Sequence, residues 1–120
     1  MKDFLLIYQG GDEAWMEAGP EEMQSHMAEW GQWFKELEAS GNLRNPGAAL
    51  EPGGTVLTSN GGGISTDTTM SEVKELIGGF SVIQAGSIEE ASELAKGGPF
   101  LKRNPGGQVV VRPVMTPPEG

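Results

Sequence analysis

One histidine and one aspartate offer the clearest means of acid–base chemistry in this sequence. His26 is the only histidine among the 120 residues, and histidine is the one side chain whose unperturbed pKa lies near neutrality. If Asp67 reaches His26 across the domain, its carboxylate would orient the imidazole and make it a general base. Two plainer interpretations stay open. His26 could be a partly buried residue bonded to a backbone carbonyl, and Asp67 could close a turn through its own following backbone.

Four further side chains are candidates for ligand contacts. Arg112 follows an apolar run and could hold a carboxylate through two parallel hydrogen bonds, or form a salt bridge at a sheet edge. Tyr8 and Trp30 are candidate contacts for a ligand, although core and dimer packing is the favoured interpretation of Trp30. Glu72 could face a pocket, or form a solvated pair with the lysine that follows it by two positions.

Several common kinds of site find no support. The chain has no cysteine, so disulfides and thiolate metal sites are excluded, and a single histidine makes a zinc site within one subunit improbable. The three consecutive glycines at 61–63 lack the ending of a phosphate-binding loop, and no serine lies in a nucleophile elbow. We therefore expect neither a metal nor another cofactor.

The net charge and the hydropathy of the sequence argue against nucleic-acid and membrane partners. The formal charge is −9, from 17 acidic against 8 basic residues, and no basic stripe is present. Nucleic acid is thus not an expected partner. No apolar run approaches the roughly 18 residues of a membrane span, and no secretory signal is visible. We expect a soluble cytoplasmic protein without a membrane partner.

The elements that must position these residues begin with a strand and a long helix. Residues 2–8 read KDFLLIY, with apolar side chains on both faces, which is typical of a central strand. A helix is predicted from Pro20, a residue favoured at the first helical position, to a stop at Ser40-Gly41. His26 and Trp33 lie beside its apolar stripe and widen it. The stripe itself comprises Met23, Met27, Trp30, Phe34 and Leu37.

The second half of the chain is predicted from its turns and caps. Residues 55–58 and 64–66 read as a hairpin around the glycine run, followed by a loop over 67–77 and a strand over 79–85. Ser87 and Glu90 form a capping box at the start of a second helix, which ends at the run 97–99, Gly-Gly-Pro. A final strand is expected over 108–114, and residues 116–120 are expected to be a loose tail.

This order of elements predicts one α+β domain over residues 1–115. Strand, helix, hairpin, strand, helix and strand suggest a ferredoxin-like βαββαβ arrangement, with an antiparallel sheet and two helices on one face. The other face of the sheet would then be bare, yet the strands are apolar on both faces. An exposed apolar face usually marks a partner, so a homodimer is expected.

The stretch from Asp67 to Phe80 resembles the signature of the YCII-related (DGPF) family. That signature has Asp-Gly-Pro-Phe, then a Glu, a Lys-Glu pair and Gly-Gly-aromatic; here Asp67 is kept, but Thr-Thr-Met replaces Gly-Pro-Phe. The second helix and the closing Val-Val-Val-Arg-Pro-Val strand are similar too. The resemblance implies a dimeric α/β-barrel-like assembly and a small-molecule enzyme. Some relatives are thought to use a histidine–aspartate pair, but their histidine would fall at Trp30, so that pair does not transfer residue for residue to His26.

Two functions from different classes follow. The first is a small-molecule enzyme of hydrolase or lyase type, with His26 as base, Asp67 as its orienting carboxylate and Arg112 as an anion anchor. The second is a non-catalytic dimer that binds a small ligand or serves an accessory role. A contact between His26 and a carboxylate inside a concave pocket would favour the enzyme.

Overall fold

A four-stranded antiparallel sheet forms the centre of the protein. The computed structural model describes residues 1–10, 19–51, 53–67 and 77–117, and the strands of this main sheet follow the order β2-β5-β1-β6. Strand β1 (Lys2–Gly10) lies between β5 (Ile77–Ala85) and β6 (Gly107–Pro113). The central position predicted from its two apolar faces is thus confirmed, and so is the α+β class with an antiparallel sheet.

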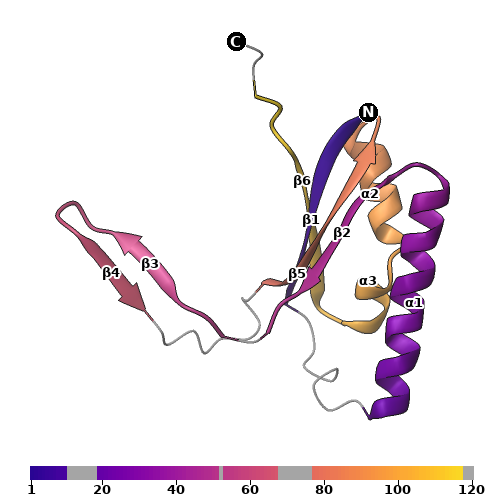
Figure 1. Ribbon diagram of the computed structural model, residues 1–120, viewed down its shortest axis with the longest axis horizontal. Coiled ribbons are helices and arrows are strands. Elements are labelled where there is room, and N and C mark those ends of the chain that lie inside the picture. Colours follow the sequence, from indigo (N-terminus) through magenta and orange to yellow (C-terminus); the bar gives the residue numbers. More distant parts are fainter. Residues whose placement is uncertain (11–18, 52, 68–76, 118–120) are drawn as a thin grey trace.

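Three helices cover one side of the main sheet (Figure 1). The long helix α1 (Pro20–Ala39) has the bounds predicted from its proline start and its stop at Gly41, which takes a positive φ of 78°. Helix α2 (Ile88–Lys96) was also predicted. Helix α3 (Pro99–Arg103) was not, because Pro99 was interpreted only as the end of α2. A proline that cannot continue one helix is well suited to begin the next.

The core lies between the helices and one face of β1 and β5. Its buried members are Phe4, Leu6, Tyr8, Trp33, Leu37, Ile83, Ala85, Ala91 and Ala95. On α1 the buried positions are Trp33 and Leu37, at 6% and 3% exposure, whereas Met23 and Met27 are 40% and 65% exposed. The predicted apolar stripe is therefore wrong as a core face in its first half, where α1 borders a pocket instead.

The outer strand beside β5 is β2 (Leu43–Ala49), which the sequence did not predict. The expectation that the hairpin supplies this part of the sheet is wrong. Proline and glycine are depleted in strands, which hides β2 in the sequence, but both are tolerated at an edge and at bulges. The pairing of β2 with β5 shifts register between Leu43 and Asn45 and again between Asn45 and Ala48, with Pro46 and Gly47 in the second irregular stretch.

The predicted hairpin exists but stands apart. Strands β3 (Val56–Ser59) and β4 (Ile64–Asp67) pair only with each other, in a separate two-stranded sheet. Figure 1 shows this hairpin, which we call the arm, projecting from the main sheet on the side away from the helices. With the arm set aside, the main elements follow the order β, α, β, β, α, β with α3 added, which is compatible with the expected ferredoxin-like arrangement.

The side of the main sheet away from the helices, which we call the uncovered face, carries a group of apolar side chains and one arginine. Cross-strand partners in an antiparallel sheet point to the same face. Leu5 pairs with Val82 and Arg112, and Ile7 pairs with Phe80 and Val110. Since Phe4, Leu6 and Tyr8 point to the helices, these partners point away from them. In a single chain all of them but the exposed Arg112 are only partly buried.

Candidate functional site

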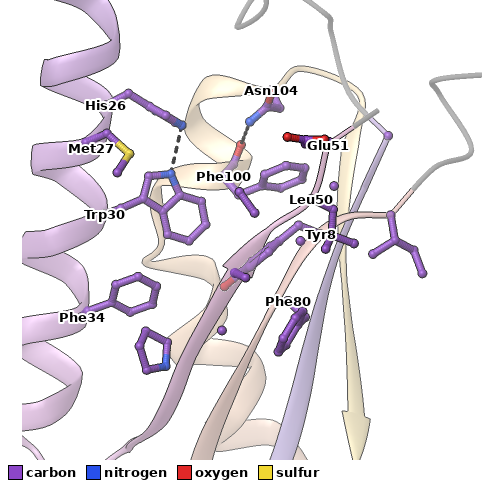
Figure 2. Close-up of a pocket in the computed structure, with 18 of the residues that line it drawn as sticks. Tyr8, His26, Met27, Trp30, Phe34, Leu50, Glu51, Phe80, Phe100 and Asn104 are labelled. Carbon is purple, nitrogen blue, oxygen red and sulfur yellow. Dashed lines mark hydrogen bonds between the residues drawn. The ribbon is translucent and has the colours of Figure 1, made fainter. Parts of the chain in front are cut away.

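A pocket opens between the first half of α1, the adjoining end of the main sheet and α3 (Figure 2). Its volume is about 330 Å³. Helix α1 contributes two methionines, two aromatic side chains and the histidine, while the strands and α3 supply the opposite wall. The residues that line it are Tyr8, Gly10, Met23, His26, Met27, Trp30, Phe34, Pro46, Gly47, Ala48, Ala49, Leu50, Glu51, Ile77, Gly78, Gly79, Phe80, Phe100 and Asn104.

Aromatic rings dominate this wall, and Trp30 lies at their centre. The indole of Trp30 packs edge-on against Tyr8, with ring centroids 5.1 Å apart, and at 5.6 Å against Phe34. Tyr8 in turn lies 5.2 Å from Phe100 of α3. Edge-to-face and tilted contacts at these separations are favourable beyond simple burial. The rings therefore hold one another in place and give the pocket a preformed apolar surface.

His26 is held by Trp30 through a side-chain hydrogen bond. The indole N–H of Trp30 donates to Nε2 of His26 at 3.0 Å (Figure 2). An accepting nitrogen must keep its lone pair, so the imidazole is neutral and its proton is on Nδ1. Residues four apart share a helix face, which is why this pair forms within α1. The ring nitrogen that a general base would need is thus already engaged.

The surroundings of His26 favour this neutral form. Partial burial lowers the pKa of His26 below its ordinary value of 6.5, and the positive charge of Arg103 lowers it further, against the opposing effect of Glu29. Arg103 of α3 and Glu29 of α1 form a two-contact ion pair beside the pocket, with Nε donating to the carboxylate at 3.2 Å. Because the two charges compensate each other, this pair adds no net charge to the site.

The Tyr8 hydroxyl is engaged within the sheet. It donates to Oγ of Ser81 at 2.9 Å, and Ser81 donates to the carbonyl oxygen of Pro46 at 2.8 Å. This chain of bonds joins β1, β5 and the irregular part of β2, which forms the pocket wall. Burial raises the pKa of Tyr8 to about 12, although the bond to Ser81 acts in the opposite direction. Tyr8 therefore stays protonated at neutral pH and serves as a structural wall residue.

The pocket carries little charge. Among the described residues that line it, only Glu51 is charged at neutral pH, since His26 is held neutral. Asn104 donates from its side-chain amide to the carbonyl oxygen of Phe100 at 2.9 Å, which closes the end of α3. The arrangement is suited to holding an apolar molecule, with few polar groups to orient it.

The structure brings three of the predicted site residues together and separates two others. His26, Trp30 and Tyr8 all line the pocket. Arg112 points from β6 to the uncovered face, on the far side of the main sheet from the pocket. Asp67 ends β4 in the arm, which Figure 1 shows far from α1. Within one chain, neither Asp67 nor Arg112 therefore joins His26. Glu72 and most of the predicted loop over 67–77 lie outside the described residues.

Sequence reasoning missed the far wall of the pocket. Leu50 follows the unpredicted strand β2, and Phe100 and Asn104 belong to or cap the unpredicted helix α3. Pro99 after two glycines was the available signal for α3, because this residue pattern can begin a helix as well as end one. Met27 was predicted only as a member of the apolar stripe of the helix, and it lies exposed at the pocket.

The described part of the chain offers neither a metal-binding cluster nor a membrane-spanning helix. There, no cluster of three or more histidine, aspartate and glutamate side chains is arranged to hold a metal ion. Nor does any helix in these ranges combine the length and the apolar character needed to cross a bilayer.

Comparison with known proteins identifies the family. A search of curated proteins finds no match to this chain. The family model described as the YCII-related domain matches residues 1–116, which includes every described helix and strand. The resemblance seen around Asp67 and Phe80 is thereby confirmed over nearly the whole chain. The chain belongs to the YCII-related family.

Proposed function

We propose that this protein binds a small, largely apolar, ring-containing organic molecule in the pocket between α1, the main sheet and α3. The observation that carries the proposal is the preformed aromatic wall around a cavity of about 330 Å³. Small-molecule sites typically range from about 300 to 1,000 Å³ and are mostly apolar, with a few polar groups. This pocket lies at the small end of that range.

The polar groups of the pocket define the ligand further. The indole N–H of Trp30 and Nε2 of His26 bond to each other, and Tyr8 is bonded to Ser81, so these residues present mainly ring surface to a ligand. A ligand carboxylate or phosphate would meet no cationic side chain among the described lining residues, and it would meet the carboxylate of Glu51. Desolvating an unpaired anion is costly. The preferred ligand is therefore uncharged, and Arg112 is not its anchor within the same chain.

An acid–base enzyme of hydrolase or lyase type is the second candidate. Its support is the position of His26 in the pocket wall, where a neutral imidazole could act on a bound substrate. For Nε2 to accept a proton, the bond from Trp30 must first break. A partnership with Asp67 would require that residue to come from a second copy of the chain. Both requirements make ligand binding the better-supported function.

The assembly we propose is a homodimer in which the uncovered faces of two ferredoxin-like sheets pack together in a barrel-like arrangement. The apolar side chains of Leu5, Ile7 and Val82 support it, because a folded monomer gains nothing from leaving them in water. Arg112 beside Leu5 would then lie at the edge or within the seam between the two chains. A cytoplasmic location and the absence of nucleic-acid and membrane partners stay predictions.

A fluorescent apolar probe tests the binding proposal. We expect N-phenyl-1-naphthylamine, an uncharged dye with two ring systems, to gain fluorescence on binding and to be displaced by small aromatic compounds. Met27→Lys, which places a charge at the pocket, should weaken dye binding by about tenfold. Met115→Lys is the matched control, because Met115 is exposed and is not a pocket residue. Equal binding by both variants would contradict the pocket assignment.

A second measurement separates binding from catalysis. Compounds that displace the dye are incubated with the protein and followed by mass spectrometry. Compounds recovered unchanged support a binding function. Conversion by the unmodified protein that is lost in His26→Gln would instead establish the enzyme, since glutamine can keep the bond to Trp30 but does not act as a base.

A further inference from the structure

We propose that the arm, β3 and β4, packs against a second copy of this chain seated on the uncovered face. The inference rests on the proposed homodimer and adds to it a second contact region outside the main sheet. It assigns a role to two described strands that take no part in the core or the pocket.

The side chains of β3 and β4 are not buried by the described part of their own chain. Its eight strand residues are all exposed, including Leu57 at 66% and Ile64 at 72%. A two-stranded hairpin alone is marginally stable in water. Large apolar side chains on such a hairpin indicate that another surface covers them.

The register places the two most exposed apolar side chains of the arm, Leu57 and Ile64, on one side. Leu57 pairs with Thr66, and Ser59 pairs with Ile64, so these four residues share a side. Thr58 and Ser65 point to the other side, where Ser65 Oγ also donates to the Thr58 carbonyl at 3.3 Å. Val56 and Asp67 share that second side, so the arm has one side with both of its most exposed apolar residues and one mixed side.

The direction of the arm points to a second copy as that partner. The helices cover one side of the main sheet, and the arm extends from the other side, over the space that the uncovered face borders (Figure 1). The Cα radius of gyration is 16.5 Å, whereas a compact chain of this length has about 14 Å. A partner docked on the uncovered face would fill the space beneath the arm.

Twofold symmetry makes this arrangement self-complementary. Each chain supplies one uncovered face and one unsupported arm, and a twofold axis brings each arm beside the other chain without leaving either surface unmatched. A different partner protein would have to match both surfaces at once, whereas a second copy provides both by repetition. The chain itself therefore accounts for both unpartnered surfaces.

Analytical ultracentrifugation of the full chain with paired variants tests the arm. We expect the double variant Leu57→Asn with Ile64→Asn to raise the dimer dissociation constant by about tenfold or more. The matched control, Thr58→Asn with Ser65→Asn on the other side of the arm, should leave it nearly unchanged. Circular dichroism confirms that both variants are folded, which is expected because all four positions are exposed.

Hydrogen exchange of the unmodified protein provides a test without substitution. Amides of β3 and β4 should exchange slowly at concentrations where the dimer dominates, and should lose protection on dilution below the dissociation constant. A dimer whose arm amides exchange at free-peptide rates, with a dissociation constant unaffected by the Leu57 and Ile64 substitutions, would overturn the arm contact and leave the dimer standing. A chain that sediments as a monomer at every concentration would overturn both.

Discussion

The two sides of the main sheet are built from the same strands but meet different surroundings. On the side of the helices, Leu6 and Ile83 are fully buried, and Tyr8 lies under the aromatic cluster of the pocket. On the other side, Ile7 and Val82 are their direct neighbours along β1 and β5, yet no helix or strand among the described residues covers them. Adjacent aliphatic residues of the same strand thus face either the buried core or the uncovered side of the sheet. The covered side stabilises the single chain, whereas the uncovered side is available for a partner.

The pocket proposed to bind a ligand lies at one end of the covered side of the main sheet. There α1 extends past the buried Trp33 and Leu37 toward its exposed first turns, and the sheet edge becomes irregular at Pro46 and Gly47. Gly47 has a positive φ of 76°, and a Cβ placed there would lie 1.7 Å from the carbonyl oxygen of Phe80. Only glycine allows β2 to approach β5 so closely. The pocket lies where the close packing of α1 on the sheet ends and the pairing of β2 with β5 becomes irregular.

The largest expected effect comes from exchanging matched residues on the two sides of β1. Leu6→Ala should lower the free energy of unfolding by about 3 kcal/mol, because it leaves a cavity at a position with no exposure. This loss should be the same at every protein concentration. Ile7→Ala should cost a monomer about 1 kcal/mol or less and act mainly by weakening the dimer.

Urea unfolding followed by circular dichroism at several protein concentrations measures both effects. The comparison between the two sides would fail if Ile7→Ala matched Leu6→Ala in dilute solution. If the protein is dimeric and the loss of stability in Ile7→Ala does not depend on protein concentration, the assignment of Ile7 to the dimer contact is also wrong.

A smaller effect is expected from the hydroxyl relay that supports the pocket wall. Tyr8→Phe removes the bond to Ser81 but keeps the ring contacts to Trp30 and Phe100. We expect a loss of about 1 kcal/mol in the free energy of unfolding, typical of one buried hydrogen bond. Dye binding should change little, since the ring surface remains. A large loss of binding without a change in stability would instead place the hydroxyl in direct contact with the ligand.

The smallest effect is a pH dependence that originates at His26. The pKa of His26 is lowered in the folded chain from 6.5, so the unfolded chain binds more protons in the window just below that value. The free energy of unfolding should therefore rise with pH through this window, and the His26 contribution should be lost as the pH falls below 6.5. His26→Gln should flatten this part of the pH profile, because glutamine does not titrate.

Thermal unfolding across this range, with the two proteins compared at each pH, measures the difference. Trp30 fluorescence provides an independent signal, since protonation of Nε2 removes the acceptor of its indole N–H. Parallel profiles for the two proteins would show that His26 is not held neutral by its surroundings.

Much of the fold was predictable because its signals are local. Pro20 and Gly41 mark the ends of α1, and Ser87 accepts from the backbone N–H of Glu90 at 3.1 Å, as the capping box predicts. The carboxylate of Glu90 reaches back one residue further than expected, to the N–H of Gly86 at 3.3 Å. The hairpin of the arm was predicted for the same reason, since its turn and its two strands are adjacent in the chain.

The candidate site was predictable only in part. His26 and Trp30 lie one helical turn apart, so the sequence could place them together, but it could not show that the indole N–H of one occupies Nε2 of the other. The pairing of His26 with Asp67 relied on a contact across the domain, and the structure places these residues in separate regions of one chain. Their juxtaposition in a dimer stays a prediction.

Local spacing along the chain therefore specified α1, α2, β1 and the arm, because caps, turns and periodicity act over a few residues. The edge strand β2, helix α3 and the pocket that they enclose depended on the tertiary structure. Strand β2 contains a proline and a glycine that are tolerated only at an irregular sheet edge. The pocket forms where Tyr8, Trp30, Leu50 and Phe100 meet, and residues so far apart in the chain are brought together only when the helices pack on the sheet.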